Sequence, residues 1–261
     1  MDGNADARRL STRQRRRAIL DLLQEHDFVA TSELAERFDI TDVSVRRDLA
    51  ELARRGSLLR VRGGAVPVRG AAPAQQRQTE HVAQKRRIGA VAATLIKPAS
   101  VVFVDGGSTT IEVVRALPEG VRSSITIVTH SLPVLETVAR WPVSRLVSLG
   151  GTYVEEHEIF AGPQTVATIE RLSADVAIVG CDGLSADGGL TTPHELAGEV
   201  IAAMVGRARS VIVVADAGKV GRRGFTPVAP TSVIGAVVTD AAADANEVDA
   251  LRASGVDVRV A

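Results

Sequence analysis

From residue 82 to residue 261, the sequence alternates short runs of β-branched residues with longer segments in which apolar side chains recur at helical spacing. Parallel neighbouring strands need a crossover connection, usually a helix, so this alternation favours an α/β domain with a mostly parallel sheet between two helical layers. Aromatic residues make up only 3% of the chain, so its core must be largely aliphatic. The predicted strands are Ser100–Val104, Ile125–Val128, Arg145–Leu149, Asp175–Gly180, Ser210–Ala215, Val233–Val238 and Val256–Val260, and the predicted helices include Gln84–Ile96, Thr109–Leu117, Leu132–Arg140, Gln164–Leu172 and Glu195–Val205.

Residues 13–66 have a different pattern, in which three amphipathic helical segments precede one short alternating segment. Thr31 and Ser32 stand before an acidic residue and an apolar pair, which is a helix-start signal. Thr41 or Asp42 can cap a third helix, and Gly56 can end it. The predicted helices span residues 15–26, 33–38 and 42–55.

The third of these helices has two distinct faces. At about 100° per residue, Val45, Leu49 and Leu52 fall on one stripe, which must pack inward. The opposite side carries arginines, whose planar guanidinium groups can donate two hydrogen bonds at once to guanine edges or phosphates. This arrangement predicts a recognition helix for the major groove, with Val43, Arg47 and Arg54 outward and Ser44 and Arg46 on the flanks.

A short hairpin is expected after this helix. Leu58–Arg62 alternates as a strand does, and Gly63 and Gly64 supply a turn. This hairpin would be the wing of a winged helix-turn-helix that binds double-stranded DNA, although a small three-helix bundle with solvated arginines is the simpler alternative. The predicted DNA-binding residues are Thr31, Ser32, Thr41, Val43, Ser44, Arg46, Arg47, Arg54, Arg60, Arg62, Gly63 and Gly64.

The distribution of charge supports an anionic partner for the N-terminal part alone. The formal net charge is zero, but residues 1–70 hold 14 arginines against 11 acidic residues, and residues 71–261 hold 17 basic against 20 acidic residues. Arginine occupies six of the ten positions from Arg8 to Arg17. A basic head on a mildly acidic body is typical of nucleic-acid binding, although a charge cluster is often only a solvated face.

Several classes of protein are not indicated by the sequence. It has no apolar run of about 18 residues and no apolar secretory segment near residue 1, so no membrane partner is expected. The single cysteine, Cys181, fits a reducing compartment, and the expected location is the cytoplasm. No two histidines are spaced i, i+4 and there is no Cys-x-x-Cys motif, so we expect no metal and no cofactor.

Polar residues and glycines follow nearly every predicted strand of the larger domain. Open α/β sheets bind ligands beyond the carboxyl ends of their strands, so these residues predict a binding site. The Asp105–Thr110 loop joins a strand to a helix start, and its glycines and hydroxyls suit a phosphate, although an ordinary glycine-rich turn is the alternative. The candidate effector-binding residues are Asp105, Gly106, Gly107, Ser108, Thr109, Thr110, Thr129, His130, Ser131, Gly150, Gly151, Asp182, Gly183 and Lys219.

An enzyme is the main rival interpretation of this set. Carboxylates and a lysine around a phosphate site could move protons on a sugar phosphate, as in an isomerase, with Asp105, Asp182, Glu195 and Lys219 as the candidates. Fold alone does not decide function. A metabolic enzyme needs no recognition helix, so we expect binding without turnover. A purely architectural DNA-binding protein is less favoured, because this interpretation assigns no function to the larger domain.

The motifs resemble those of the DeoR family of bacterial transcriptional regulators over roughly residues 13–261. In the smaller domain the resemblance is carried by Glu33–Phe38, by Val45-Arg46-Arg47-Asp48-Leu49 and Gly56, and by Arg62-Gly63-Gly64-Ala65. In the larger domain it is carried by Val104–Thr110, Gly150-Gly151, Gly162-Pro163, Gly183 with Gly189-Leu190-Thr191, and Asp216–Lys219.

The resemblance implies a domain plan and a function. The plan is a basic tail over 1–12, a winged helix-turn-helix over 13–66, a linker over 67–81 and an effector-sensing domain over 82–261, similar in fold to ribose-5-phosphate isomerase. The implied protein is a homodimeric or homotetrameric repressor of carbohydrate genes, controlled by a phosphorylated sugar-like effector. Asp105, Gly106, Ser108, Thr109 and Thr110 would hold the phosphate beside Thr129 and Ser131, Asp182 would bind sugar hydroxyls, and Lys219 would bind an anion.

The chain departs from the family pattern at two places. Ser44-Val45 replaces the usual Thr-Ile, which keeps a hydroxyl and a β-branched residue. His130 stands where the family commonly has asparagine, and this change alters both the size and the charge that the side chain can carry. The second departure therefore bears on which effector fits.

Overall fold

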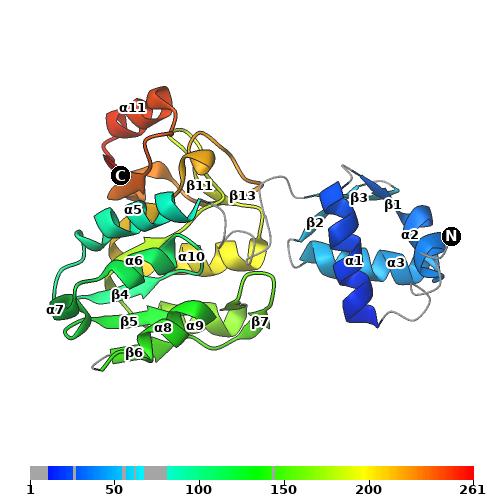
Figure 1. Cartoon of the computed structure of the whole chain (residues 1–261), viewed down its shortest axis with the longest axis horizontal. Coiled ribbons are helices and arrows are strands. Elements are labelled where there is room, and N and C mark those ends of the chain that lie inside the picture. Colours follow the sequence, from blue (N-terminus) through cyan, green and yellow to red (C-terminus); the bar gives the residue numbers. More distant parts are fainter. Residues whose placement is uncertain (1–10, 26–27, 55–56, 62, 68–80, 143–144) are drawn as a thin grey trace. The chain divides into compact units, whose positions relative to one another are not determined.

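The computed structural model describes residues 11–25, 28–54, 57–61, 63–67, 81–142 and 145–261. The chain divides into two compact units, Met1–Ala71 and Ala72–Ala261, which are coloured from blue to cyan and from cyan to red in Figure 1. Most of the predicted basic tail and linker lies outside the described residues. Within the described segments, no helix has the length and apolarity needed to cross a membrane.

The smaller unit is a winged helix-turn-helix. Its helices are α1 (Thr12–Glu25), α2 (Thr31–Phe38) and α3 (Asp42–Arg54), and its strands are β1 (Val29–Ala30), β2 (Leu58–Val61) and β3 (Gly64–Pro67). The strands form an antiparallel sheet in the order β1-β3-β2. β2 and β3 are the predicted wing, whereas the two-residue β1 is too short to leave a periodic pattern in the sequence.

The larger unit contains the predicted parallel sheet. Its seven strands lie in the order β15-β14-β12-β9-β4-β5-β6, and every neighbouring pair is parallel. All seven predicted strands are therefore confirmed, with ends that differ by one or two residues, and by three where the predicted Val233–Val238 begins. Their bounds are β4 Val101–Val104, β5 Thr126–Thr129, β6 Arg145–Ser148, β9 Ala174–Val179, β12 Ala208–Val214, β14 Ala236–Thr239 and β15 Asp257–Val260.

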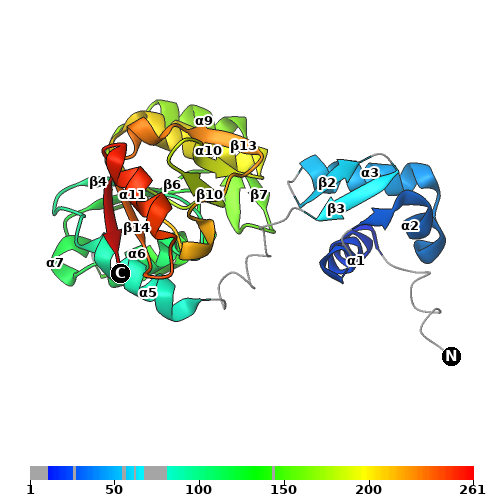
Figure 2. The same cartoon turned by 90° about the horizontal axis from the view of Figure 1, so that it is seen from above.

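Helices cover both faces of this sheet, as Figure 2 shows. One apolar cluster joins alternate strand residues such as Val102 and Val104 to α5 (Val82–Ala93), α6 (Thr110–Ala116) and α8 (Leu132–Val138). The intervening Phe103 belongs to a second cluster, on the other face, with residues of three further helices. These are α9 (Pro163–Glu170), α10 (Glu195–Arg207) and α11 (Ala245–Ala253), while the short α7 (Glu119–Arg122), η2 (Ala217–Lys219) and η3 (Thr231–Val233) lie in connections.

Two small antiparallel elements were not predicted. β10 (Gly183–Ser185), β11 (Gly189–Thr192) and β13 (Thr226–Ala229) form a three-stranded sheet. β7 (Thr152–Val154) and β8 (Ile159–Ala161) form a hairpin whose turn is Glu155–Glu158. Within this turn only Glu155 is exposed, and the other three residues are partly buried.

Candidate functional site

The recognition helix α3 has the two faces that its sequence predicts. Val45, Leu49 and Leu52 are almost fully buried in the core of the smaller unit. On the other side Val43 is 73% exposed, and Arg46 and Arg47 are exposed as well. An apolar side chain this exposed at the start of a recognition helix can contact a thymine methyl group in the major groove.

The ends of α3 are held by local contacts. The Ser44 amide donates to the Thr41 hydroxyl over 3.3 Å, so Thr41 caps the helix. At the other end Arg54 donates to the Glu51 carboxylate over 2.7 Å. Arg46 lies 4.0 Å from Asp42 in an exposed ion pair, which water screens and DNA phosphates can replace.

The other predicted DNA-binding residues divide between surface and interior. Ser32 and Arg60 are exposed, whereas Thr31 is buried as the first residue of α2. Gly63 has a φ of 88°, which a turn glycine adopts easily. A side chain at Gly64 would collide with the carbonyl oxygen of Val29. Arg62 lies outside the described residues.

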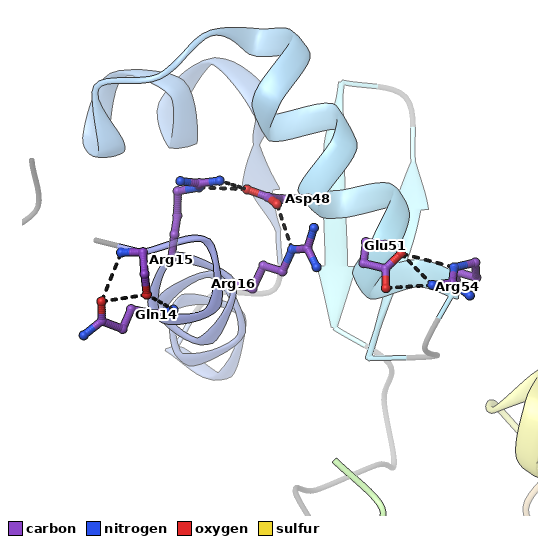
Figure 3. A network of polar contacts seen from close by, with 7 residues as sticks. Gln14, Arg15, Arg16, Asp48, Glu51 and Arg54 are labelled. Carbon is purple, nitrogen blue, oxygen red and sulfur yellow. Dashed lines mark hydrogen bonds and ion pairs between the residues drawn. The ribbon is translucent and has the colours of Figure 1, made fainter. Parts of the chain in front are cut away.

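A buried ion cluster behind α3 is a feature that the sequence reasoning missed. The Asp48 carboxylate accepts hydrogen bonds from Arg15 Nε over 2.8 Å and from Arg16 Nε over 2.7 Å (Figure 3). Two members of the arginine-rich segment therefore face the interior of the unit rather than its surface. The sequence did contain one indication of this cluster, because an aspartate directly precedes Leu49 and so lies next to the buried stripe of the helix.

The larger unit has a topological switch point between β4 and β9. From β4 the sheet continues through β5 and β6 in one direction, whereas β9, β12, β14 and β15 extend it in the other. The loops that follow β4 and β9 consequently leave the sheet toward opposite faces. In open α/β sheets the ligand site lies beyond the carboxyl ends of the strands at such a point. We call the residues that follow these strands the C-terminal edge of the sheet.

Asp105 joins the two sides of the switch point. Its side chain is buried, and one carboxylate oxygen accepts from the Gly180 amide after β9 over 3.0 Å. The other oxygen accepts from the Gly106 amide over 2.7 Å and lies 2.9 Å from His130 Nε2. Asp105 therefore holds the loops that follow β4 and β9 together, and these contacts form without a ligand.

His130 connects Asp105 to the β7–β8 hairpin. The ring is fully buried, and its Nδ1 atom lies 2.9 Å from the Phe160 carbonyl oxygen, which can only accept, so Nδ1 carries a hydrogen. Its Nε2 atom lies 2.9 Å from Asp105 Oδ1 and accepts from the Gly106 amide over 3.2 Å. His130 therefore holds the loop that follows β4 against the hairpin.

The β7–β8 hairpin packs over the loop that follows β4. A side chain at Gly106 would collide with Ile159 Cγ2, so glycine permits this close approach. The Phe160 amide also donates to the His130 carbonyl oxygen over 2.8 Å. Gly107 is exposed and Ser108 is partly buried, whereas Thr109 and Thr110 are buried at the start of α6.

A second polar group lies on the β9 side of the edge. Lys219 Nζ is 3.6 Å from Asp182 Oδ1, with the two side chains 18% and 16% exposed. The other oxygen of Asp182 accepts from the Thr192 hydroxyl over 2.9 Å. The neighbouring Cys181 thiol has a raised pKa, mainly because it is buried and also because Asp182 is close, although Lys219 opposes the shift.

The remaining predicted effector residues have structural contacts. The Thr129 hydroxyl donates to the Val104 carbonyl oxygen over 2.7 Å and accepts from the Ser131 amide over 3.1 Å. Gly150 and Gly151 follow the edge strand β6, and the Gly150 carbonyl oxygen accepts from Thr165 over 2.6 Å. Gly183 is buried in β10, where a side chain would meet the Thr191 hydroxyl.

Metal ligands do not gather in the described part of the chain, where no group of three or more His, Cys, Asp or Glu side chains is placed to hold an ion. Cys181 is partly buried at the end of β9, next to Asp182. The described polar groups of the C-terminal edge suit an anionic or hydroxyl-bearing organic ligand.

Comparisons with known proteins place both units in one family. The family model described as the DeoR-like helix-turn-helix domain matches residues 15–69, and the one described as the DeoR C-terminal sensor domain matches residues 80–241. The chain is 33% identical to the HTH-type transcriptional regulator GlpR of Haloferax volcanii, over 94% of this chain and 96% of that protein. It is 32% identical to the glycerol-3-phosphate regulon repressor of Escherichia coli K12, over 87% and 90% respectively.

Two further similarities were found. The transcriptional repressor AccR of Agrobacterium fabrum is 32% identical over 88% of this chain and 90% of that protein. Among solved structures, ribose 5-phosphate isomerase A from Methanocaldococcus jannaschii matches with a TM-score of 0.38 and 17% identity over 52% of each chain. This structural likeness is too low to bear on function.

Proposed function

Because the chain belongs to the DeoR family of transcriptional regulators, we propose that it represses genes of carbohydrate metabolism and releases them when a phosphorylated sugar-like effector binds. The observation that carries the proposal is that one chain contains both an exposed arginine face on α3 and, in the larger unit, a sheet whose switch point is surrounded by polar residues. We expect the chain to act in the cytoplasm, where its DNA target would lie.

The DNA partner is recognised by the outer side of α3 and by the wing. Val43, Arg46 and Arg47 would reach base edges, since all three are exposed on that side. Arg60 on the wing would contact the phosphate backbone. One winged helix reads few base pairs, so the chain would act as a symmetric homodimer or homotetramer on repeated half-sites.

The effector would span the two polar groups of the C-terminal edge. Its phosphate would lie on the loop that follows β4, where exposed Gly107 and partly buried Ser108 precede α6. Beneath this loop, the Asp105 carboxylate is already occupied by the amides of Gly106 and Gly180 and by its contact with His130. Hydroxyl groups of the effector would reach Asp182, and Lys219 would neutralise a negative charge.

Binding is expected without turnover. An isomerase needs a carboxylate that is available to take a proton from carbon. Both Asp105 oxygens already accept backbone hydrogen bonds, and the Asp182 carboxylate contacts Lys219 and accepts from the Thr192 hydroxyl. These contacts support a sensor rather than a catalyst.

A ligand screen tests the proposal. The purified chain is heated with a panel of pentose, hexose and triose phosphates and with the matching unphosphorylated compounds. We expect at least one phosphorylated compound to raise the melting temperature, because a ligand that binds only the folded state stabilises it. The same compound should weaken binding to DNA by a factor that corresponds to a coupling of about 1–3 kcal/mol. Stabilisation by the unphosphorylated compounds alone, or conversion of a sugar phosphate to its isomer, would contradict the proposal.

A further inference from the structure

The ion cluster behind α3 joins two helices through three charged side chains. Asp48 on α3 is 3% exposed, and it is contacted by Arg15 and Arg16 of α1, which are 15% and 22% exposed. Each arginine takes a different carboxylate oxygen. The carboxylate is therefore almost fully removed from water, the two guanidinium groups are largely so, and both acceptor atoms of the carboxylate are occupied (Figure 3).

The helix that carries the two arginines has a fixed start. The Gln14 amide donates to the Ser11 hydroxyl over 3.3 Å, and the Ser11 amide donates to the Gln14 side-chain oxygen over 3.0 Å. This reciprocal pair is a capping box, which fixes the first turn of a helix. Arg15 and Arg16 follow directly, so their guanidinium groups project from an ordered turn.

Apolar packing alone leaves the orientation of α3 loosely determined. Burial of Val45, Leu49 and Leu52 decides which side of the helix faces inward, but the hydrophobic effect has no preferred direction. Charge-assisted hydrogen bonds are short and directional. If α3 rotated or slid by about one ångström, at least one of the contacts at Asp48 would break, so the cluster fixes the rotation and register of the helix.

The register of α3 matters most for the side chains that face DNA. Arg46 and Arg47 directly precede Asp48 on the helix, so a fixed position for Asp48 also fixes theirs. Contacts to base edges require such placement, whereas contacts to phosphates tolerate displacement because the backbone charge is continuous along the duplex.

From these observations we propose that Asp48, Arg15 and Arg16 form a positioning clamp that sets the sequence specificity of α3 rather than its total affinity for DNA. Asp48 is a positioning residue, since its carboxylate faces α1 and does not reach DNA. The inference rests on the proposed DNA-binding function. It adds that three residues without base contacts contribute to sequence specificity.

Electrostatics alone predicts a different result for a change at Asp48. Asp48→Asn removes one negative charge, so the smaller unit becomes more positive by one unit, and its affinity for every duplex should rise equally or stay constant. A positioning role predicts in addition that the preference for one sequence over another falls. The ratio of the two affinities therefore separates the explanations.

The experiment measures a ratio of dissociation constants. A duplex is selected by the wild-type chain from a randomised pool, and binding to this duplex and to a scrambled duplex of equal length is followed by fluorescence anisotropy. For Asp48→Asn we expect the preference for the selected duplex to fall at least tenfold, while affinity for the scrambled duplex is unchanged or higher. Arg17→Ala is the matched control. It removes an arginine next to Arg16 whose partner is the exposed Asp21, so the ratio should stay as in the wild type.

A second variant separates positioning from stability. In Arg15→Met/Arg16→Met/Asp48→Leu, apolar side chains replace the buried charges, a change that is often neutral or stabilising. We expect the melting temperature of the wild type, but a preference for the selected over the scrambled duplex that is still at least tenfold lower than in the wild type. If this variant does not fold, as judged by circular dichroism, Asp48→Asn decides alone.

Two results would overturn the clamp. The first is an unchanged ratio in Asp48→Asn, which includes an equal loss of affinity for both duplexes, and the second is a folded triple variant with wild-type preference. Failure of the wild-type chain to enrich any sequence is a different outcome, because it would contradict sequence-specific DNA binding itself.

Discussion

Both units of the molecule contain a buried aspartate at the centre of a polar network, and the two networks are built differently. Asp48 in the smaller unit accepts hydrogen bonds from the side chains of two arginines on another helix. Asp105 in the larger unit accepts from backbone amides of two loops and contacts one histidine. The first network joins two helices, whereas the second joins two loops at the switch point of a sheet.

The difference reflects what each unit must hold in place. A recognition helix must present its outer side chains in a fixed register, and long charged side chains from a neighbouring helix can set that register. The C-terminal edge of the sheet must instead hold two loops close together, and backbone amides bond Asp105 there without a further charged side chain. The consequences of removing each aspartate should therefore differ in size and in the function that is lost.

The largest effect is expected for Asp48→Ala. This change leaves two largely buried guanidinium groups without a carboxylate, and breaking a buried ion pair in this way costs roughly 3 kcal/mol of stability when the partners keep some exposure to water. Urea unfolding followed by circular dichroism measures the loss. The control Asp21→Ala removes a carboxylate from an exposed pair with Arg17 and should cost less than about 1 kcal/mol. Equal losses in both variants would remove the distinction between the clamp and a surface pair.

A somewhat smaller effect is expected for Asp105→Ala. The Gly180 amide loses its acceptor and the Gly106 amide keeps only the longer bond to His130 Nε2, which together costs about 2 kcal/mol. The effector response measured by calorimetry should be blunted, while binding to the selected duplex should persist. Asp249→Ala, which changes an exposed carboxylate on α11, should leave both properties as they are. Loss of DNA binding in Asp105→Ala would mean that the two networks are not separable.

Arg47→Ala is expected to weaken DNA binding without affecting the larger unit. Arg47 is exposed on the outer side of α3, and one lost base contact costs about 1–3 kcal/mol of affinity for the selected duplex. Gel-shift titration measures this change, and calorimetry should show normal effector binding. Arg46→Ala should behave alike. Unchanged gel-shift affinity in both variants would contradict docking through this side of α3.

Lys219→Ala should affect only the effector. Lys219 lies 3.6 Å from Asp182, and both side chains are partly in contact with water. The expected loss of effector affinity is therefore only about 1 kcal/mol, with DNA affinity unchanged. Calorimetric titration with the compound found in the screen measures it. An unchanged affinity would mean that the anion of the effector does not contact Lys219.

The smallest effect concerns the reactivity of Cys181. Burial raises the pKa of this thiol, and the nearby Asp182 carboxylate raises it further, so less thiolate is present at pH 8 than in an unperturbed cysteine. Iodoacetamide should therefore alkylate the native chain more slowly than the urea-unfolded chain. Mass spectrometry follows the reaction. Equal rates would mean that the thiol at the end of β9 is accessible and ionises normally.

Much of the fold was predictable because hydrophobic periodicity is a local property. The buried stripe of Val45, Leu49 and Leu52 and the seven strands of the parallel sheet all follow from patterns within single segments. The small sheet of β10, β11 and β13 was not predictable in this way. Its strands are only three or four residues long, two of them begin with glycine, and β10 and β11 are buried throughout, so no alternation marks them.

The sequence predicted where polar residues gather at the edge of the sheet, but not how they contact one another. The sequence identified Asp105 and His130 because each follows a strand, and parallel strands end at the same edge of a sheet. It assigned Asp105 to the phosphate, whereas the structure shows its carboxylate bonded to Gly106 and Gly180. Ligand contacts by the other candidates at this edge stay predictions.

The sequence by itself determined the main helices and the seven strands of the parallel sheet, which side of α3 is apolar, and which strand ends carry polar residues. Only the tertiary structure decided which polar groups meet. Asp48 lies 33 positions from Arg15, and Asp105 lies 75 positions from Gly180. The physical reason is that burial is set by the spacing of residues along one element, whereas a hydrogen bond needs two atoms about 3 Å apart, and distant segments reach that separation only after they have packed.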